Sequence, residues 1–168
     1  AGSTFPQGYS SETGADMLLT NAAADINKPR GSLESLDDVT AIFKAQPEET
    51  MLNFLKASIK TNKEETEDVK KLHQAYSDGR FEELIPLLEE TEQRTLKLVD
   101  TKYAKAMSDW LKNDLLIRRN LAWLPEIRKQ SAKQSTLFAV GIAHLPSEKG
   151  LIELLRQEGY QVTPEPKV

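Results

Sequence analysis

Apolar side chains recur at helical spacing through the middle of the chain, and this pattern constrains the fold more than any other feature. The clearest run steps by three or four residues, at Leu96, Val99, Tyr103, Met107 and Trp110. Such a step places the side chains along one side of a helix, where they can pack against neighbouring helices. Less regular runs of the same kind extend over about residues 37–133. We therefore expect this region to form a bundle of helices.

Residues that begin or end helices divide this region. Asp37 or Asp38 is placed to cap its first helix. Gly79 should end a later helix, because glycine readily adopts the left-handed conformation that closes a helix. Pro125 should kink or restart the last helix, which then runs to about Lys133.

Three short segments near the ends of the chain favour β-strands, at about residues 30–34, 136–141 and 160–163. The second is uniformly apolar from Leu137 to Val140, which is typical of a strand covered on both faces. An amphipathic helix between the second and third segments would complete a right-handed βαβ unit at the C-terminus. We therefore predict a helix-dominated α/β fold, in which a small, mostly parallel sheet of two or three strands packs on the helical bundle.

Length and composition limit the class of protein. A chain of 168 residues suits one domain, which we place at residues 12–168, after a flexible arm at residues 1–11. The net charge of −4 gives no basic footprint for nucleic acid, and the absence of cysteine excludes disulfides and thiol catalysis. No apolar run approaches the roughly 18 residues of a membrane span. The first ten residues lack the features of a signal peptide, and we expect a mature form or a fragment because no methionine begins the chain.

His144 is the first candidate for a chemical role. It follows the predicted strand at 136–141, in the loop before a helix, and ligands bind at this edge of open α/β sheets. Gly141, three residues earlier, would let the backbone turn tightly. An imidazole at this place could bind a metal or act as a general base. The alternative is an ordinary histidine that hydrogen-bonds the turn.

Glu34 is the second candidate, at the end of the predicted strand at 30–34. If that strand pairs beside residues 136–141, Glu34 and His144 come to the same edge of the sheet. A carboxylate and an imidazole suit divalent metals, although three protein ligands are typical of a working site. The alternative is a carboxylate that caps a helix or faces solvent.

Arg118, Arg119 and Asn120 form the third candidate group. Two adjacent guanidinium groups on a helix cannot both face away from the core. One of them could bind a carboxylate or a phosphate with its planar fork. The alternative is an ion pair on the surface, which adds little stability.

Three blocks of the chain resemble the TraB/GumN family, which is related to the ChaN-like and erythromycin-esterase-like proteins. The most specific is "LFAVGIAHLPSEKGLIELLRQEGYQVTP", which is similar to an apolar strand followed by G-x-x-H-L, G-L, a helix and G-Y-x-V. The second block, "ETGADMLLTNAAADINKPRGSLES", is similar to a G-x-D helix that leads to L-E-[ST]. The third, "IRRNLAW", resembles the R-N segment of the family. The blocks occur in the family order and span nearly the whole chain.

The resemblance implies a role for each matching residue. His144 corresponds to the histidine of the second G-x-x-H motif, with Gly141 as its glycine, and Glu34 corresponds to the glutamate of L-E-[ST]. Arg119 and Asn120 correspond to the R-N pair. Since animal relatives are described as metal-dependent proteases, the resemblance implies that His144 and Glu34 are ligands of Mn²⁺, Co²⁺ or Zn²⁺, or that one is a ligand and the other a general base. Arg119 would then orient a peptide or protein substrate or hold Glu34.

The chain departs from the family in one respect that bears on activity. It lacks the earlier G-x-x-H motif and the strand that follows it, and therefore corresponds to the C-terminal portion of the family domain. We expect a metal-dependent hydrolase site that this chain alone does not complete. The alternative is a non-catalytic module that binds a peptide or protein, which includes a regulator of pheromone signalling at the cell envelope. A sheet without its first strands would also expose an edge, which favours self-association.

Overall fold

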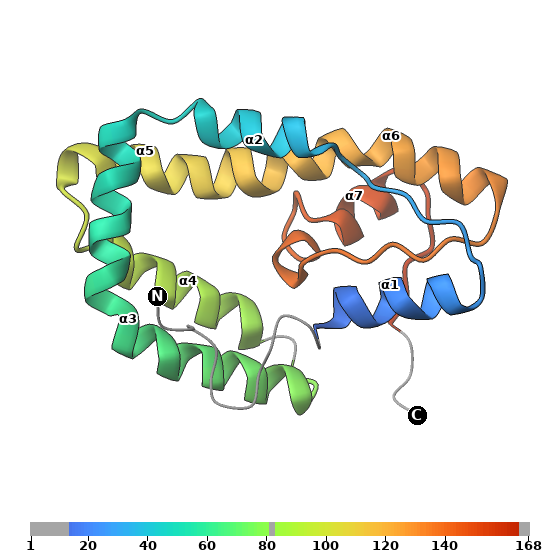
Figure 1. The fold of residues 1–168 in the computed structure, drawn as a ribbon, viewed down its shortest axis with the longest axis horizontal. Helices are drawn as coiled ribbons and strands as arrows, with labels where there is room; N and C mark the ends of the chain where they lie inside the picture. The colour runs from blue at the N-terminus through green and yellow to red at the C-terminus, as the bar shows by residue number, and fades with distance from the viewer. Residues whose placement is uncertain (1–13, 81–82, 165–168) are drawn as a thin grey trace. The chain divides into compact units, whose positions relative to one another are not determined.

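The computed structural model describes residues 14–80 and 83–164, and the regular elements in these ranges are all helices (Figure 1). They are, in chain order, α1 (Ala15–Asp25), α2 (Leu36–Lys44), α3 (Glu48–Ser77), α4 (Leu84–Leu96), α5 (Thr101–Asp109), η3 (Trp110–Ile117), α6 (Arg118–Lys133), η4 (Ile142–His144) and α7 (Leu151–Gln157). The element η3 is a π-helix, and η4 is a short 3₁₀-helix. The expected helical region over about residues 37–133 is confirmed. No helix in the described ranges is long and apolar enough to cross a membrane, as the sequence indicated.

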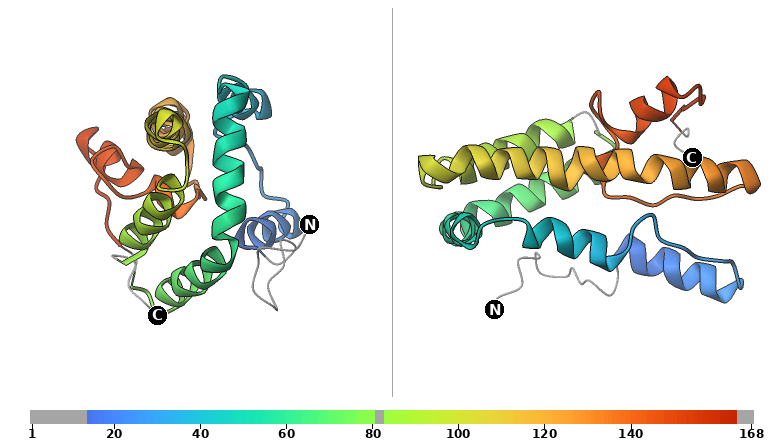
Figure 2. Two further views of the ribbon diagram at one scale, coloured as in Figure 1. Left: turned by 90° about the vertical axis from the view of Figure 1, so that its left-hand side faces the viewer. Right: turned by 90° about the horizontal axis from the view of Figure 1, so that it is seen from above.

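The predicted α/β fold is wrong, because residues 30–34, 136–141 and 160–163 form no strand in the described structure. Residues 135–140 run as an extended segment back along α6, but no backbone hydrogen bond pairs them with another described residue (Figures 1 and 2). Phe138 and Val140 pack on the helices, whereas Leu137 is 73% exposed. The segment is therefore covered on one face only, by helices, and the C-terminal βαβ unit does not form.

The chain divides into two compact units, each of which is described by itself. The first contains residues 1–32 and 44–108, and the second contains residues 33–43 and 109–168. The flexible arm expected at residues 1–11 lies outside the described residues. The single domain expected over residues 12–168 stays a prediction, as does self-association, for which the described residues offer no sheet edge.

The first unit is built around the packing of α3 on α4 (Figure 1). α3 is a single helix of 30 residues that ends where the sequence predicted, because Gly79 follows it in the left-handed conformation with φ of 70°. The buried carboxylate of Asp68 on α3 accepts hydrogen bonds from Arg94 at 2.6 Å and from Thr91 at 3.1 Å, both on α4. These hydrogen bonds compensate the cost of burying the negative charge of Asp68.

The second unit has a small apolar core between α6 and α7, which lie side by side in Figure 2. Its buried members are Trp123, Leu124, Ile127, Leu151 and Leu154. Further apolar residues pack around them, namely Leu33, Phe138, Val140, Leu145 and Leu155. α6 passes through Pro125 as one helix, so that the expected restart does not occur. The buried side chains on both sides of the proline hold the helix in place despite the lost hydrogen bond.

Candidate functional site

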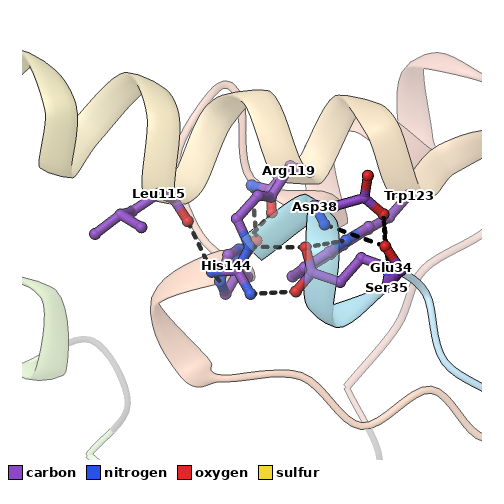
Figure 3. Close-up of polar contacts among 8 residues, drawn as sticks. Glu34, Ser35, Asp38, Leu115, Arg119, Trp123 and His144 are labelled. Carbon is purple, nitrogen blue, oxygen red and sulfur yellow. Dashed lines mark hydrogen bonds and ion pairs between the residues drawn. The ribbon is translucent and has the colours of Figure 1, made fainter. Parts of the chain in front are cut away.

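A capping box at the start of α2 positions Glu34. The Ser35 hydroxyl oxygen accepts a hydrogen bond from the Asp38 N–H at 3.1 Å, and the Asp38 carboxylate accepts one from the Ser35 N–H at 2.9 Å. Ser35 is therefore the cap, and the expectation that Asp37 or Asp38 caps this helix is corrected. Glu34 precedes the cap, and its carboxylate is directed at Arg119 (Figure 3).

Arg119 lies in the first turn of α6, directly after the π-helix η3. The wider turns of η3 are visible in the N–H of Arg118, which bonds the carbonyl oxygen of Asn113, five residues earlier. The guanidinium Nη1 of Arg119 donates to the carbonyl oxygen of Leu115 at 3.0 Å. This bond ties the side chain back to η3 and leaves its other nitrogens to face Glu34.

Arg119 and Glu34 form a bidentate ion pair. Nε of Arg119 lies 3.0 Å from Oε2 of Glu34, and Nη2 lies 2.5 Å from Oε1. Trp123 adds a third hydrogen bond, from its indole Nε1 to Oε2 at 3.2 Å, and its ring lies under the guanidinium at 4.9 Å. The hydrogen bonds from Arg119 hold the pKa of Glu34 below its ordinary value, against the opposing effect of burial. Glu34 is therefore ionised at neutral pH.

His144 lies in η4, where its N–H bonds the carbonyl oxygen of Gly141 at 2.9 Å. The residue is only 7% exposed, and its ring lies 4.5 Å from the ring of Trp123. Nε2 of the imidazole lies 3.3 Å from Nη1 of Arg119 (Figure 3). Burial lowers the pKa of His144, the positive charge of Arg119 lowers it further, and the charge of Glu34 opposes both. Near neutral pH the imidazole is therefore uncharged.

Asn120 completes the cluster at the Nδ1 side of the imidazole. It is 2% exposed, and its Oδ1 lies 2.7 Å from Nδ1 of His144. Its Nδ2 donates to the carbonyl oxygens of Lys149 at 2.8 Å and of His144 at 3.3 Å. One side chain of α6 thus binds both the imidazole and the loop that carries it.

Four of the six residues singled out from the sequence meet in this cluster, namely Glu34, Arg119, Asn120 and His144. Arg118 does not, because its side chain is 75% exposed and pairs with Asp114 at 3.1 Å. Gly141 contributes only its carbonyl oxygen. Its φ of −58° is open to any residue, so the expected need for a glycine in a tight turn is not met.

Trp123 is the member that the sequence analysis missed. It touches Glu34, Arg119 and His144, and thus joins the three chemical groups. A signal was available, because Trp123 lies four residues after Arg119 and therefore on the same side of the helix.

Comparison with known proteins places these residues in a family. Residues 4–164 match the family model described as the TraB/PrgY/gumN family. The chain belongs to the TraB/PrgY/gumN family. The resemblance seen in the sequence is therefore confirmed over nearly the whole chain. Neither the curated proteins nor the solved structures contain a match.

In this TraB/PrgY/gumN chain, Glu34 and His144 would suit a divalent metal in kind, as a carboxylate and a neutral imidazole. They fall short in number, since no group of three or more candidate ligands occurs among the described residues. Arg119 also bonds both carboxylate oxygens and Nε2 of the imidazole. A metal held by these two residues would have to displace Arg119 and gain a ligand from outside the described residues.

Proposed function

We propose that the cluster of Glu34, Arg119 and His144 is one part of a metal-dependent hydrolase site that acts on peptides or proteins. The observation that carries the proposal is their convergence from distant positions. Glu34 and Arg119 are 85 residues apart in sequence, and Arg119 and His144 are 25 apart. A partly buried carboxylate and a buried imidazole that both contact one guanidinium are groups that hydrolytic chemistry uses.

The protonation states in the cluster support this assignment. The lowered pKa values keep Glu34 anionic and His144 neutral near pH 7. Both residues are therefore in the form that binds a metal or accepts a proton. When bound, a divalent metal would supply a Lewis acid that polarises a carbonyl group and acidifies water. Arg119, which the metal would displace from Glu34 and His144, would then orient an oxygen of the substrate.

The chain by itself is expected to be inactive. Glu34 and His144 supply two ligands, and a working site needs at least one more. The missing ligand would come from outside the described residues, either from another part of the protein or from a second chain.

Metal titration tests the proposal most directly. Calorimetry with Mn²⁺, Co²⁺ and Zn²⁺ would compare the native chain with Arg119→Gln, which frees the donor atoms of Glu34 and His144. If the donors form a latent site, Arg119→Gln binds metal at least roughly tenfold more tightly than the native chain. Adding His144→Ala to that variant should remove the gain.

His73→Ala is the matched control, because His73 is the other histidine and lies exposed on α3. It should leave metal affinity unchanged. Equal affinities of Arg119→Gln and the native chain would contradict the assignment of Glu34 and His144 as ligands.

A non-catalytic module that binds a peptide or protein is the second candidate. It is favoured by the completeness of the cluster, since no buried side-chain nitrogen or oxygen of the described residues lacks a hydrogen-bond partner. A site that waits for a metal or substrate usually leaves such an atom. In this case the cluster holds the second unit together, and the cell envelope is the location that the family resemblance implies. Loss of stability in Glu34→Gln without metal binding by any variant would favour this function.

A further inference from the structure

The orientation of the Asn120 amide follows from its neighbours. One end of the amide lies within 2.8 Å of the Lys149 carbonyl oxygen and 3.3 Å of the His144 carbonyl oxygen. Carbonyl oxygens only accept hydrogen bonds, so this end must be the NH₂ group. The atom that faces Nδ1 of His144 at 2.7 Å is therefore the amide oxygen, which only accepts.

This orientation decides where the proton of His144 lies. Because the amide oxygen accepts, Nδ1 must carry a hydrogen and donate it. On the other side of the ring, Nη1 of Arg119 only donates, at 3.3 Å from Nε2. Nε2 must therefore be unprotonated. The two contacts are satisfied together only by the neutral Nδ1–H tautomer, whereas a free histidine side chain favours the proton on Nε2.

We infer that Asn120 is a positioning residue that fixes His144 as the Nδ1–H tautomer, so that Nε2 presents its lone pair to Arg119. Asn120 is suited to this role because two main-chain oxygens fix the orientation of its amide, and because the residue is only 2% exposed. Histidines that bind metals usually donate their second nitrogen to such a partner, which fixes the reactive nitrogen. The value of this arrangement for catalysis rests on the function proposed above, but the tautomer itself does not.

The tautomer can be read from ¹⁵N shifts in long-range ¹H–¹⁵N NMR spectra, recorded at alkaline pH so that the imidazole is neutral. The chain has two histidines, and the exposed His73, whose Nε2 lies 3.5 Å from the Ser77 hydroxyl, gives a second ring for comparison. We expect pyrrole-type Nδ1 and pyridine-type Nε2 for His144. The reverse pattern at His144 in the native chain would overturn the inference.

Three variants separate the role of Asn120 from that of its neighbours. Asn120→Leu keeps the bulk but removes the acceptor, and should raise the population of the Nε2–H tautomer of His144 although Arg119 still opposes it. Asn120→Asp loses the two hydrogen bonds to the main-chain oxygens but keeps an acceptor for Nδ1, and should retain the Nδ1–H tautomer. Arg119→Met removes the donor to Nε2 and should leave the tautomer unchanged. A change of tautomer in Arg119→Met would assign the control to Arg119 instead.

The same variants distinguish this inference from the proposed function. If the Arg119→Gln chain binds metal, adding Asn120→Leu should weaken binding by about 10- to 100-fold, as for other lost partners of ligating histidines. If neither the native chain nor Arg119→Gln binds metal, but His144 shows the expected tautomers, the proposed function is contradicted and the positioning role is not. If Asn120→Leu leaves the metal affinity of Arg119→Gln unchanged, and His144 of the native chain is the Nε2–H tautomer, the positioning role is contradicted but the proposed function is not.

Discussion

Removal of the Arg119 guanidinium should destabilise the second unit substantially. Arg119 donates two hydrogen bonds to Glu34, one to the Leu115 carbonyl oxygen and one to His144. The side chains of Arg119 and Glu34 are 22% and 19% exposed, so the pair lies between the surface and buried cases. Surface pairs contribute up to about 1 kcal/mol, and breaking a buried pair costs about 3–5 kcal/mol.

We expect Arg119→Met to lower the free energy of unfolding by about 3 kcal/mol, since it also leaves the Glu34 carboxylate without its counter-ion. Glu34→Gln should cost less, about 2 kcal/mol, because the amide keeps an acceptor for the guanidinium. The double variant should lose about 1–2 kcal/mol less than the sum of the two, because the second change removes a partner that is already gone.

Urea denaturation, monitored by tryptophan fluorescence, measures these losses of stability in the second unit. Both tryptophans, Trp110 and Trp123, belong to the second unit, so the signal follows that unit. Arg118→Met is the matched control, because its pair with Asp114 is exposed, and it should change the stability by less than about 0.5 kcal/mol. Losses in Arg119→Met as small as in this control, or strict additivity with Glu34→Gln, would refute the structural role of the ion pair.

Two further predictions concern His144 and its loop. Since the pKa of His144 is lowered by folding, the unfolded chain binds the proton more readily, and stability should fall as pH drops below the ordinary value of 6.5. His144→Gln should flatten this part of a plot of urea midpoint against pH, and His73→Ala should not. If the slope remains in His144→Gln, His144 does not cause the loss of stability at low pH. Gly150→Ala should destabilise the chain by more than about 3 kcal/mol in the same assay, because the added Cβ would lie 1.9 Å from the Pro146 carbonyl oxygen. Gly141→Ala should change stability by less than about 1 kcal/mol, because its Cβ would meet only His144 Cδ2, at 3.7 Å, and a large loss there would contradict the geometry.

Helices were predictable from the sequence because their signals are local. The helical region and the stop at Gly79 follow from neighbouring positions, and both were correct. The run from Leu96 to Trp110 was wrong as a single helix, because α4 ends at Leu96 and α5 begins only at Thr101. The apolar run from Leu137 to Val140 was ambiguous, because an extended segment looks the same whether a strand or a helix covers it. Hydrogen bonding to a distant partner decides between these cases, and such a partner leaves no trace in the segment itself.

Local geometry at the site was less predictable than its residue types. The π-helix before Arg118 has no clear sequence signal, yet it sets the position from which Arg119 reaches back to Leu115. The capping box was visible as serine followed three residues later by aspartate, but the sequence analysis assigned the cap to aspartate. Serine is the better choice at the capping position when an acidic residue occupies the third position of the helix.

The meeting of Glu34 and His144 was predicted for a structural reason that is wrong. The prediction relied on two paired strands, whose main-chain ladder would hold the residues at one edge. In the described structure a single guanidinium joins them, with Trp123 packed against all three groups. A ladder of main-chain hydrogen bonds would keep Glu34 and His144 at one edge whatever their side chains. Here their link depends on the side chain of Arg119. The hydrogen bonds that link Glu34 to His144 therefore run through the one side chain that a metal would have to displace, so stability and any metal affinity should respond to Arg119 in opposite directions.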